Sequence, residues 1–131
     1  MKILFATLAM FGFMLSAANA QSVDCANATT QAAMTVCAER SFKAADAELN
    51  ITYKALTQKV TEPGLANLRS AQRAWIAYRD AQCAFESAGT EDGSVQAMVI
   101  SVCREDLTRE QNSRLAGQLT CEEGDLSCGG Q

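Results

Sequence analysis

The sequence predicts an all-α domain: a small, disulfide-stapled antiparallel helical hairpin or three-helix bundle. The chain of 131 residues holds one proline, so long helices can run without interruption. Apolar residues recur every three or four positions along three long segments, which is the period of one helix face. Sustained alternation and clusters of β-branched residues, which mark strands, are both lacking. Apolar residues make up 48% and charged residues 20% of the chain, a balance typical of one globular domain.

Residues 1–20 have the pattern of a secretory signal peptide. After a positive second residue, residues 3–15 form a nearly pure apolar run, and a small-x-small triplet ends at Ala20. We therefore expect cleavage between Ala20 and Gln21, with the bacterial periplasm as the first choice of compartment and the medium as the second. The run is shorter than the roughly 20 residues of a membrane span. Because the residues before Cys25 also lack a lipid-attachment pattern, we predict no membrane anchor.

Charge and residue types exclude several classes of function. Lys2 leaves with the signal peptide, so the mature chain has ten basic against 15 acidic residues, a net charge of −5. This balance argues against nucleic acid or an anionic membrane as the main partner and favours a basic protein. The chain has no histidine, which excludes Ser–His and Cys–His catalysis and imidazole metal sites. We therefore expect no enzyme activity, no metal and no cofactor.

All six cysteines lie beyond the predicted cleavage site. An even number in a small exported domain indicates disulfides rather than zinc. Six cysteines allow fifteen pairings, between which the sequence alone does not choose. Nearness along the chain favours Cys25–Cys37, Cys83–Cys103 and Cys121–Cys128.

The first helix is expected over residues 30–60, with Thr29 or Thr30 as its N-cap. Its apolar stripe consists of Ala38, Phe42, Ala45, Leu49, Thr52, Leu56 and Val60. The phase holds throughout, so the pattern fits one long helix as well as two helices broken near Ser41. The turn at residues 61–64 ends this segment.

Two further helices and a tail complete the prediction. The second helix starts near Pro63, where a missing N–H costs nothing, and runs to about Ala88. Its stripe is Leu65, Leu68, Ala71, Trp75, Tyr78 and Gln82. Ser94 is the expected cap of the third helix, whose stripe is Val95, Met98 or Val99, Val102, Leu107, Leu115 and Leu119. The helical domain is thus expected over residues 21–119, followed by an irregular tail over 120–131 with a small disulfide loop.

Two segments carry a more specific pattern: residues 45–56 (ADAELNITYKAL) and 68–83 (LRSAQRAWIAYRDAQC). The pattern consists of Cys25, Cys37, Asp46, Leu49, Asn50, Tyr53, Leu68, Gln72, Arg73, Trp75, Asp80, Cys83 and Cys103. With these residues the chain resembles the LprI-type lysozyme-inhibitor family over about residues 25–115. The resemblance implies an exported protein whose partner is a lysozyme. The Cys121–Cys128 tail lies outside this pattern.

The polar and aromatic residues of the pattern border the apolar stripes. They are Asp46, Asn50, Tyr53, Gln72, Arg73, Trp75 and Asp80. We interpret them as a structural network at a helix seam, in which Asp46 pairs with an arginine of the second helix. A recognition surface is the alternative. Trp75 lies on the stripe and is expected to anchor the core.

Inhibition of a lysozyme calls for contacts from the loops. Animal-type lysozymes are basic outside and work with two carboxyl groups inside the cleft. An acidic inhibitor is steered to the basic surface, while a neutral or basic side chain on a constrained loop enters the cleft. Two loops, 87–94 and 121–128, qualify, with Ser87, Thr90, Glu91, Asp92, Glu122, Glu123 and Asp125 as candidate contacts. Alternatively, both are solvated turns of a non-inhibitory periplasmic module that binds a protein or a glycan.

Overall fold

The computed structural model describes residues 22–122 and 124–130. The predicted signal peptide, its cleavage site and Glu123 lie outside the described residues. Three long helices, α1 (Gln31–Lys59), α2 (Gly64–Glu86) and α3 (Gln96–Leu119), are joined by short connections. The 3-10 turn η1 (Cys25–Asn27) precedes α1, and a second, η2 (Ala88–Thr90), lies between α2 and α3. Over the described residues the chain forms no strand, and the prediction of an all-α domain is confirmed. None of these helices is both long and apolar enough to cross a bilayer.

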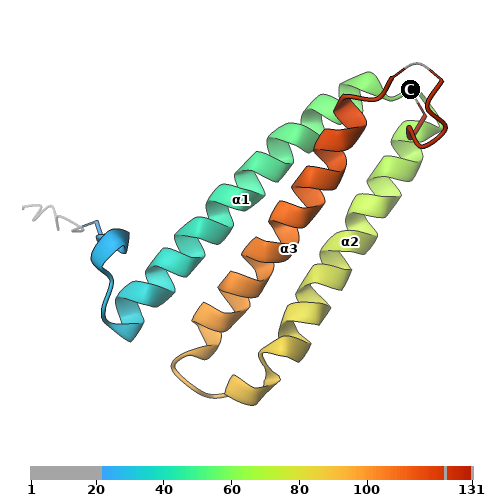
Figure 1. Cartoon of the computed structure of the whole chain (residues 1–131). Coiled ribbons are helices and arrows are strands. Elements are labelled where there is room, and N and C mark those ends of the chain that lie inside the picture. The colour runs from blue at the N-terminus through green and yellow to red at the C-terminus, as the bar shows by residue number, and fades with distance from the viewer. Residues whose placement is uncertain (1–21, 123, 131) are drawn as a thin grey trace, which may run out of the picture.

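The three helices run alternately up and down, with α3 between α1 and α2 (Figure 1). α3 packs along α1, to which it runs parallel, and makes a smaller contact with the antiparallel α2. α1 and α2 follow each other in the chain, yet few of their residues approach closely. The carboxyl ends of α1 and α3 meet where Lys59 Nζ donates a hydrogen bond to the Leu119 carbonyl oxygen at 2.6 Å. This contact places a cation at the negative end of the α3 dipole.

The helix ends follow local chemistry at some positions and tertiary contacts at others. Thr30 caps α1, its hydroxyl accepting from Ala33 N at 3.2 Å, and α1 continues past Ser41 as a single helix. The prediction that Ser94 caps α3 is wrong. Val95 is the N-cap residue and its side chain makes no cap hydrogen bond, because a tight turn precedes the helix instead, with Gln96 N donating to Gly93 O at 3.1 Å.

The apolar core is small and lies between α1 and α3. Leu49, Leu56 and Leu115 are its buried members. Partly buried side chains surround them, namely Tyr53, Val60, Leu68, Trp75 and Leu119. The predicted stripe of α1 is confirmed, since Ala45, Leu49 and Leu56 are the buried residues of that helix.

The predicted inward face of α2 is partly wrong. Ala71 is exposed, and Tyr78 is 54% exposed. The buried positions are the residues that follow them, Gln72 and Arg79, together with Cys83. Leu68 and Trp75 of the predicted stripe do pack against the core. At Ala71 and Tyr78 apolar periodicity chose the residue before the buried one, because an amide and a guanidinium, rather than hydrocarbon, face inward there.

α3 shows the same effect. Val102, which the apolar pattern placed inside, is 44% exposed, whereas Ser101 and Cys103 on either side of it are buried. The disulfide fixes the orientation of this turn, because Cys103 must face α2. Further along, Thr108 is fully buried, and its hydroxyl has no hydrogen-bond partner among the described residues.

Three disulfides pair consecutive cysteines in the order of the chain, as predicted. Cys25–Cys37 ties η1 to α1, Cys83–Cys103 joins the end of α2 to the start of α3, and Cys121–Cys128 closes a loop after α3. The middle bridge joins two of the long helices directly.

The residues after α3 fold back onto the turn between α1 and α2. The Gly130 carbonyl oxygen accepts hydrogen bonds from Thr61 N and Oγ1, both at 2.9 Å. Gly129 N donates to Gln118 Oε1 at 2.8 Å. A Cβ atom at Gly64 would lie 2.9 Å from the carbonyl oxygens of Gly129 and Gly130, so glycine is required where the two segments touch.

Candidate functional site

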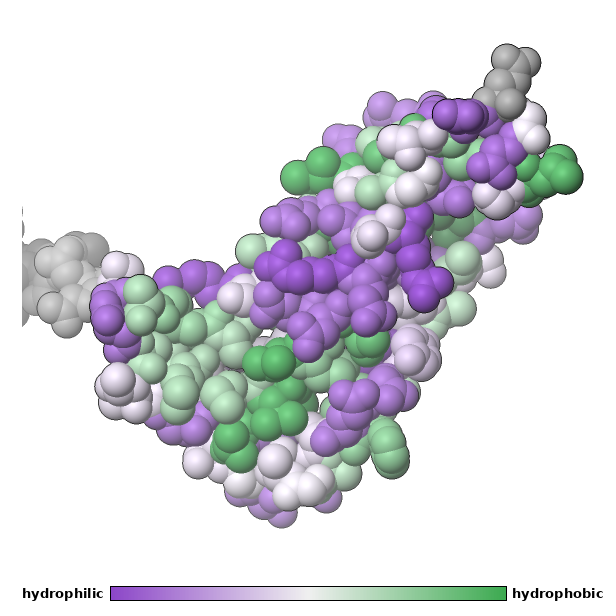
Figure 2. Space-filling view, viewed as in Figure 1, coloured by the Kyte–Doolittle hydropathy of each residue, from purple (hydrophilic) through white to green (hydrophobic). Residues whose placement is uncertain are grey.

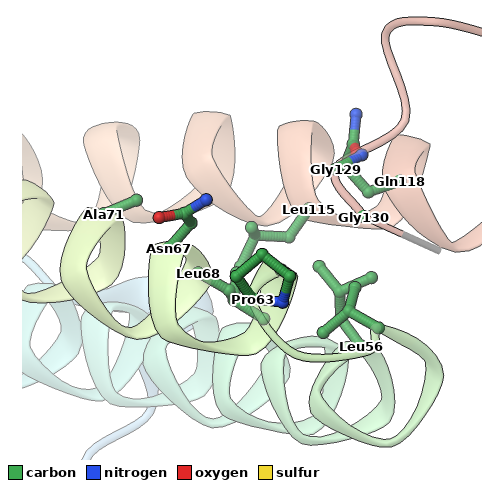
Figure 3. A pocket seen from close by; sticks show the side chains of 11 residues that line it. Leu56, Pro63, Asn67, Leu68, Ala71, Leu115, Gln118, Gly129 and Gly130 are labelled. Carbon is green, nitrogen blue, oxygen red and sulfur yellow. The ribbon is translucent and has the colours of Figure 1, made fainter.

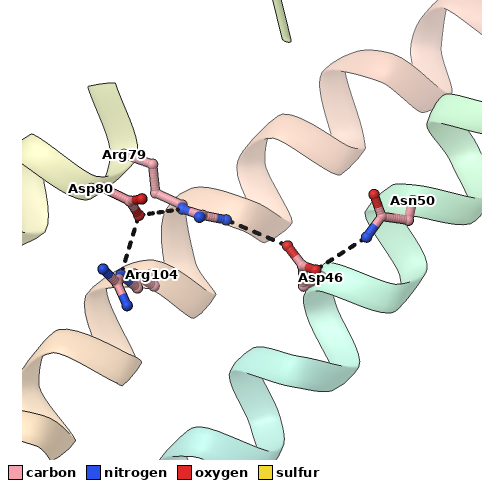
Figure 4. A network of polar contacts seen from close by, with 5 residues as sticks. All are labelled: Asp46, Asn50, Arg79, Asp80 and Arg104. Atoms are coloured by element: carbon pink, nitrogen blue, oxygen red, sulfur yellow. Dashed lines mark hydrogen bonds and ion pairs between the residues drawn. The ribbon is translucent and has the colours of Figure 1, made fainter. Parts of the chain in front are cut away.

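A network of charged side chains crosses the middle of the bundle (Figure 4). Arg79 of α2 reaches Asp46 of α1, with Nη1 at 3.4 Å from Oδ1, and donates from Nε to Asp80 Oδ1 at 3.0 Å. The same Asp80 oxygen lies 3.2 Å from Arg104 Nε of α3. Asn50 Nδ2 donates to Asp46 Oδ2 at 3.1 Å. Side chains from all three helices therefore meet around one arginine.

Arg79 is also held between two aromatic rings. Its guanidinium carbon lies 5.2 Å from the Phe42 ring centre and 5.1 Å from that of Trp75, within the range of cation–π attraction. Only 10% of the Arg79 side chain is exposed. The sequence analysis expected an arginine partner for Asp46 but did not identify Arg79. Its spacing of four residues from both Trp75 and Cys83 was the available signal.

The other predicted seam residues occupy different positions. Gln72 is buried, and its Oε1 accepts from Gln111 Nε2 of α3 at 3.4 Å. Tyr53 and Trp75 are partly buried against the core cluster. Asn50 and Arg73 are both exposed, although Asn50 also donates a hydrogen bond to Asp46. The network carries paired charges and amides, an arrangement suited to fixing the register of helices.

The connection between α2 and α3 contains four of the predicted contact residues. Ser87 is 1% exposed, and its hydroxyl donates to the Ala84 carbonyl oxygen at 3.3 Å. Thr90 Oγ1 donates to the Ser87 carbonyl oxygen at 2.7 Å. Both hydroxyls are thus engaged inside the connection, whereas Glu91 and Asp92 are exposed. The connection is a tight, ordered turn that offers carboxylates to solvent.

The loop closed by Cys121–Cys128 contains the remaining predicted contacts. Glu122 and Asp125 are exposed, and Glu123 lies outside the described residues. Asp125 Oδ1 accepts from Ser127 Oγ at 2.7 Å and from Ser127 N at 2.8 Å. These bonds favour the charged carboxylate, the one from the hydroxyl most strongly, and lower the pKa of Asp125 below its ordinary value of 3.8.

The two loops lie at opposite ends of the bundle (Figure 1). α3 separates them with its 24 residues, a length of about 36 Å at the rise of an α-helix. Glu91 and Asp92 therefore do not share a surface with Glu122 and Asp125. The structure does not bring the predicted contact residues together into one site.

An apolar pocket lies beside the turn between α1 and α2 (Figure 3). Its volume is about 370 Å³. The described residues that line it are Leu56, Val60, Pro63, Gly64, Asn67, Leu68, Ala71, Leu115, Gln118, Gly129 and Gly130. None of them carries a charge, so the pocket offers neither a general acid nor a general base.

Exposed apolar side chains occur on all three helices and in the loop closed by Cys121–Cys128. In Figure 2, hydrophilic residues cover the middle of the visible face, while hydrophobic residues gather toward the end where α3 begins. On α2, Tyr78 is 54% exposed and Phe85 is 76% exposed. Phe85 lies beyond the predicted stripe of the second helix, which ended at Gln82, and it was not among the predicted contact residues, although phenylalanine is more often buried than exposed.

Comparisons with known proteins confirm the family resemblance. A family model described as Lysozyme inhibitor LprI matches residues 24–115. An uncharacterized protein of Rhizobium meliloti (strain 1021) is 37% identical over 113 residues, covering 75% of this chain and 81% of the relative. No solved structure matches the chain. The residues matched by the family model include the charged network and the α2–α3 connection but not the loop closed by Cys121–Cys128.

Proposed function

Because the chain belongs to the lysozyme inhibitor LprI family, we propose that it is an exported bacterial protein that binds a basic lysozyme and inhibits it. The observation that carries the proposal is the family match over residues 24–115, most of the mature chain. The periplasm is the compartment in which such a protein meets a lysozyme that has crossed the outer membrane, and the medium is the second.

Charge supports this partner. The mature chain has ten basic and 15 acidic residues, so its field attracts a strongly basic protein and raises the rate of encounter. Attraction alone does not block catalysis, because the two carboxyl groups inside a lysozyme cleft repel acidic side chains. The acidic residues therefore bind around the cleft, and a neutral side chain occupies it.

The rigidity of the bundle supports inhibition by surface and loop contacts. Arg79 links all three helices through its contacts with Asp46 and Asp80 and the contact of Asp80 with Arg104. Disulfides close the connections at both ends of α3. A preformed surface loses little conformational entropy on binding. Inhibition then needs no chemistry: the bound protein excludes the polysaccharide from the cleft.

The test is a turbidity assay. The oxidised mature chain, residues 21–131, is titrated into an animal-type lysozyme acting on bacterial cells, at low salt and at roughly 0.15 M salt. We expect saturable inhibition near equal molar amounts at both salt concentrations. Inhibition confined to low salt, equal to that of an unrelated acidic protein of the same net charge, would reduce the finding to nonspecific attraction.

A second assay separates direct inhibition from protection of the cell wall. The same titration is repeated with a soluble chitin oligosaccharide as the substrate, and the mature chain is incubated with purified peptidoglycan in a sedimentation assay. Direct inhibition is expected to persist with the soluble substrate. Loss of inhibition there, with co-sedimentation of the chain, would identify a glycan-binding module instead.

A further inference from the structure

The end of the bundle at which α2 turns into α3 carries an unusual surface. Phe85 lies in the last turn of α2 with 76% of its surface exposed. Tyr78 lies seven residues earlier and Ala81 lies between them, so the three occupy one face of the helix. Ala81 is also exposed. Isolated exposed apolar residues need no explanation, but an aromatic pair on one helix face marks a contact surface.

Acidic residues flank this apolar face, and the same stretch of sequence contains no basic residue. The segment 80–103 contains Asp80, Glu86, Glu91 and Asp92 and no lysine or arginine. Asp80 is paired with Arg79 and Arg104, while the other three carboxylates are exposed. The surface therefore presents an aromatic side chain bordered by negative charge, which complements an apolar cleft bordered by positive charge.

The same segment is held in place. The Cys83–Cys103 disulfide lies two residues from Phe85 and joins α2 to α3. Within the connection, Ser87 N donates to the Cys83 carbonyl oxygen at 3.1 Å, and Gly93 N to Thr90 O at 2.9 Å. Phe85 is thus displayed from a constrained end of the bundle, so little ordering is needed on binding.

The other candidate loop also presents an exposed apolar residue, Leu126. That loop lies at the opposite end of α3 (Figure 1), so a single cleft contacts only one of the two. The family match covers residues 24–115, which include Phe85 and exclude Leu126. A function that belongs to the family therefore favours the α2–α3 end over the loop closed by Cys121–Cys128.

We infer that this end of the bundle is the docking surface for the basic lysozyme, with Phe85 as the residue that enters the cleft and Glu86, Glu91 and Asp92 as contacts around it. The inference rests on the proposed function and adds to it the contact surface. Ser87 and Thr90 do not enter the cleft in this arrangement, because their hydroxyls form hydrogen bonds within the connection. Phe85 enters instead.

Matched variants of the mature chain test the inference. Binding to an animal-type lysozyme at roughly 0.15 M salt is measured by calorimetry, alongside inhibition in the turbidity assay. Phe85→Ser is expected to raise Kd at least about tenfold, as loss of a central aromatic contact does. Ile51→Ser, which changes a 72% exposed residue of α1, and Leu126→Ser are expected to leave Kd within about twofold.

A second pair of variants tests the charge. Glu91→Lys and Glu122→Lys change the net charge equally, but at opposite ends of the bundle. Only Glu91→Lys is expected to weaken binding, mainly by slowing association. Circular dichroism checks that each variant remains folded.

The outcomes are distinguishable. If the unaltered chain neither binds nor inhibits the lysozyme, the proposed function and this inference both fail. If the unaltered chain inhibits but Phe85→Ser and Glu91→Lys bind equally well, the proposed function stands and this surface is excluded. Weakening by Leu126→Ser and Glu122→Lys instead would move the docking surface to the loop closed by Cys121–Cys128.

Discussion

Replacing Arg79 by alanine is expected to destabilise the bundle more than any other single change to its charged residues. The Arg79 side chain is 10% exposed and lies 3.4 Å from Asp46 Oδ1 and 3.0 Å from Asp80 Oδ1. It also lies 5.2 Å and 5.1 Å from the ring centres of Phe42 and Trp75. Alanine removes all four contacts and leaves a cavity where α1 and α2 approach.

The magnitude follows from the exposure of the partners. Breaking a fully buried ion pair costs about 3–5 kcal/mol, but both aspartate side chains are 42% exposed. Water therefore solvates them after the change, and each lost ionic contact is worth about 1 kcal/mol. Each ring contact is worth about 0.5 kcal/mol. The expected loss in the free energy of unfolding is about 3 kcal/mol.

Urea denaturation followed by far-ultraviolet circular dichroism measures this loss. Arg73→Ala is the matched control, since Arg73 is an exposed arginine of the same helix, and it is expected to change stability by less than about 0.5 kcal/mol. Arg79→Lys keeps the charge but loses the planar group that stacks between the rings, so it is expected to recover only part of the loss. An Arg79→Ala variant as stable as Arg73→Ala would refute the reasoning.

Four further changes have defined outcomes. Replacing both cysteines of Cys83–Cys103 by serine is expected to lower stability by about 3 kcal/mol, because the bridge spans 20 residues; thermal unfolding of the variant checks this. Gly64→Ala is expected to release the C-terminal residues and speed amide exchange in the α1–α2 turn. Gly117→Ala, whose Cβ meets nothing within 4 Å, is the control and is expected to stabilise α3 by about 0.8 kcal/mol. Equal exchange in both variants would contradict the contact of Gly64 with Gly129 and Gly130. Thr108→Val is expected to raise stability by about 1 kcal/mol, measured in urea, because it removes a buried hydroxyl without a partner among the described residues. Carbon-detected NMR titration is expected to give Asp125 a pKa below 3.8; its stabilising contribution is then complete above the ordinary pKa and lost as the pH falls through the folded one.

Much of the fold could be predicted because its signals are local. One apolar stripe continues through most of the 29-residue helix α1, and a turn containing Pro63 and Gly64 follows it, so the helix and its limits follow from neighbours in sequence. The even number of cysteines indicated disulfides, and the predicted pairing of consecutive cysteines is the one that the structure has. The prediction of Ser94 as the N-cap was wrong because a capping residue expresses only a local preference. In the structure, the Gly93 carbonyl oxygen accepts the hydrogen bond from Gln96 N at the start of α3.

The candidate site was less predictable because its partners are distant in sequence. Asp46 and Arg79 are separated by 33 residues, and the spacing of Arg79 from Trp75 and Cys83 places it on their helix face without identifying Asp46 as its partner. Apolar periodicity scored Arg79 as a solvent residue, although two rings and two carboxylates surround it. Ser87 was predicted to be a contact residue, but the connection encloses it, while the neighbouring Phe85, for which no role was predicted, projects from the end of α2.

By itself, the sequence predicted three helices, their alternating direction, the presence of disulfides and an acidic net charge, whereas the structure established which cysteines pair. These properties arise from backbone propensity, short connections and composition, each of which acts within a few residues or over the whole chain. Only the tertiary structure decided that α3 lies between the other helices, that Arg79 faces inward and that Phe85 faces outward. The physical reason is that a side chain is buried or exposed according to what the opposing helices offer it, and an arginine between two rings and two carboxylates finds a better environment there than a tyrosine would.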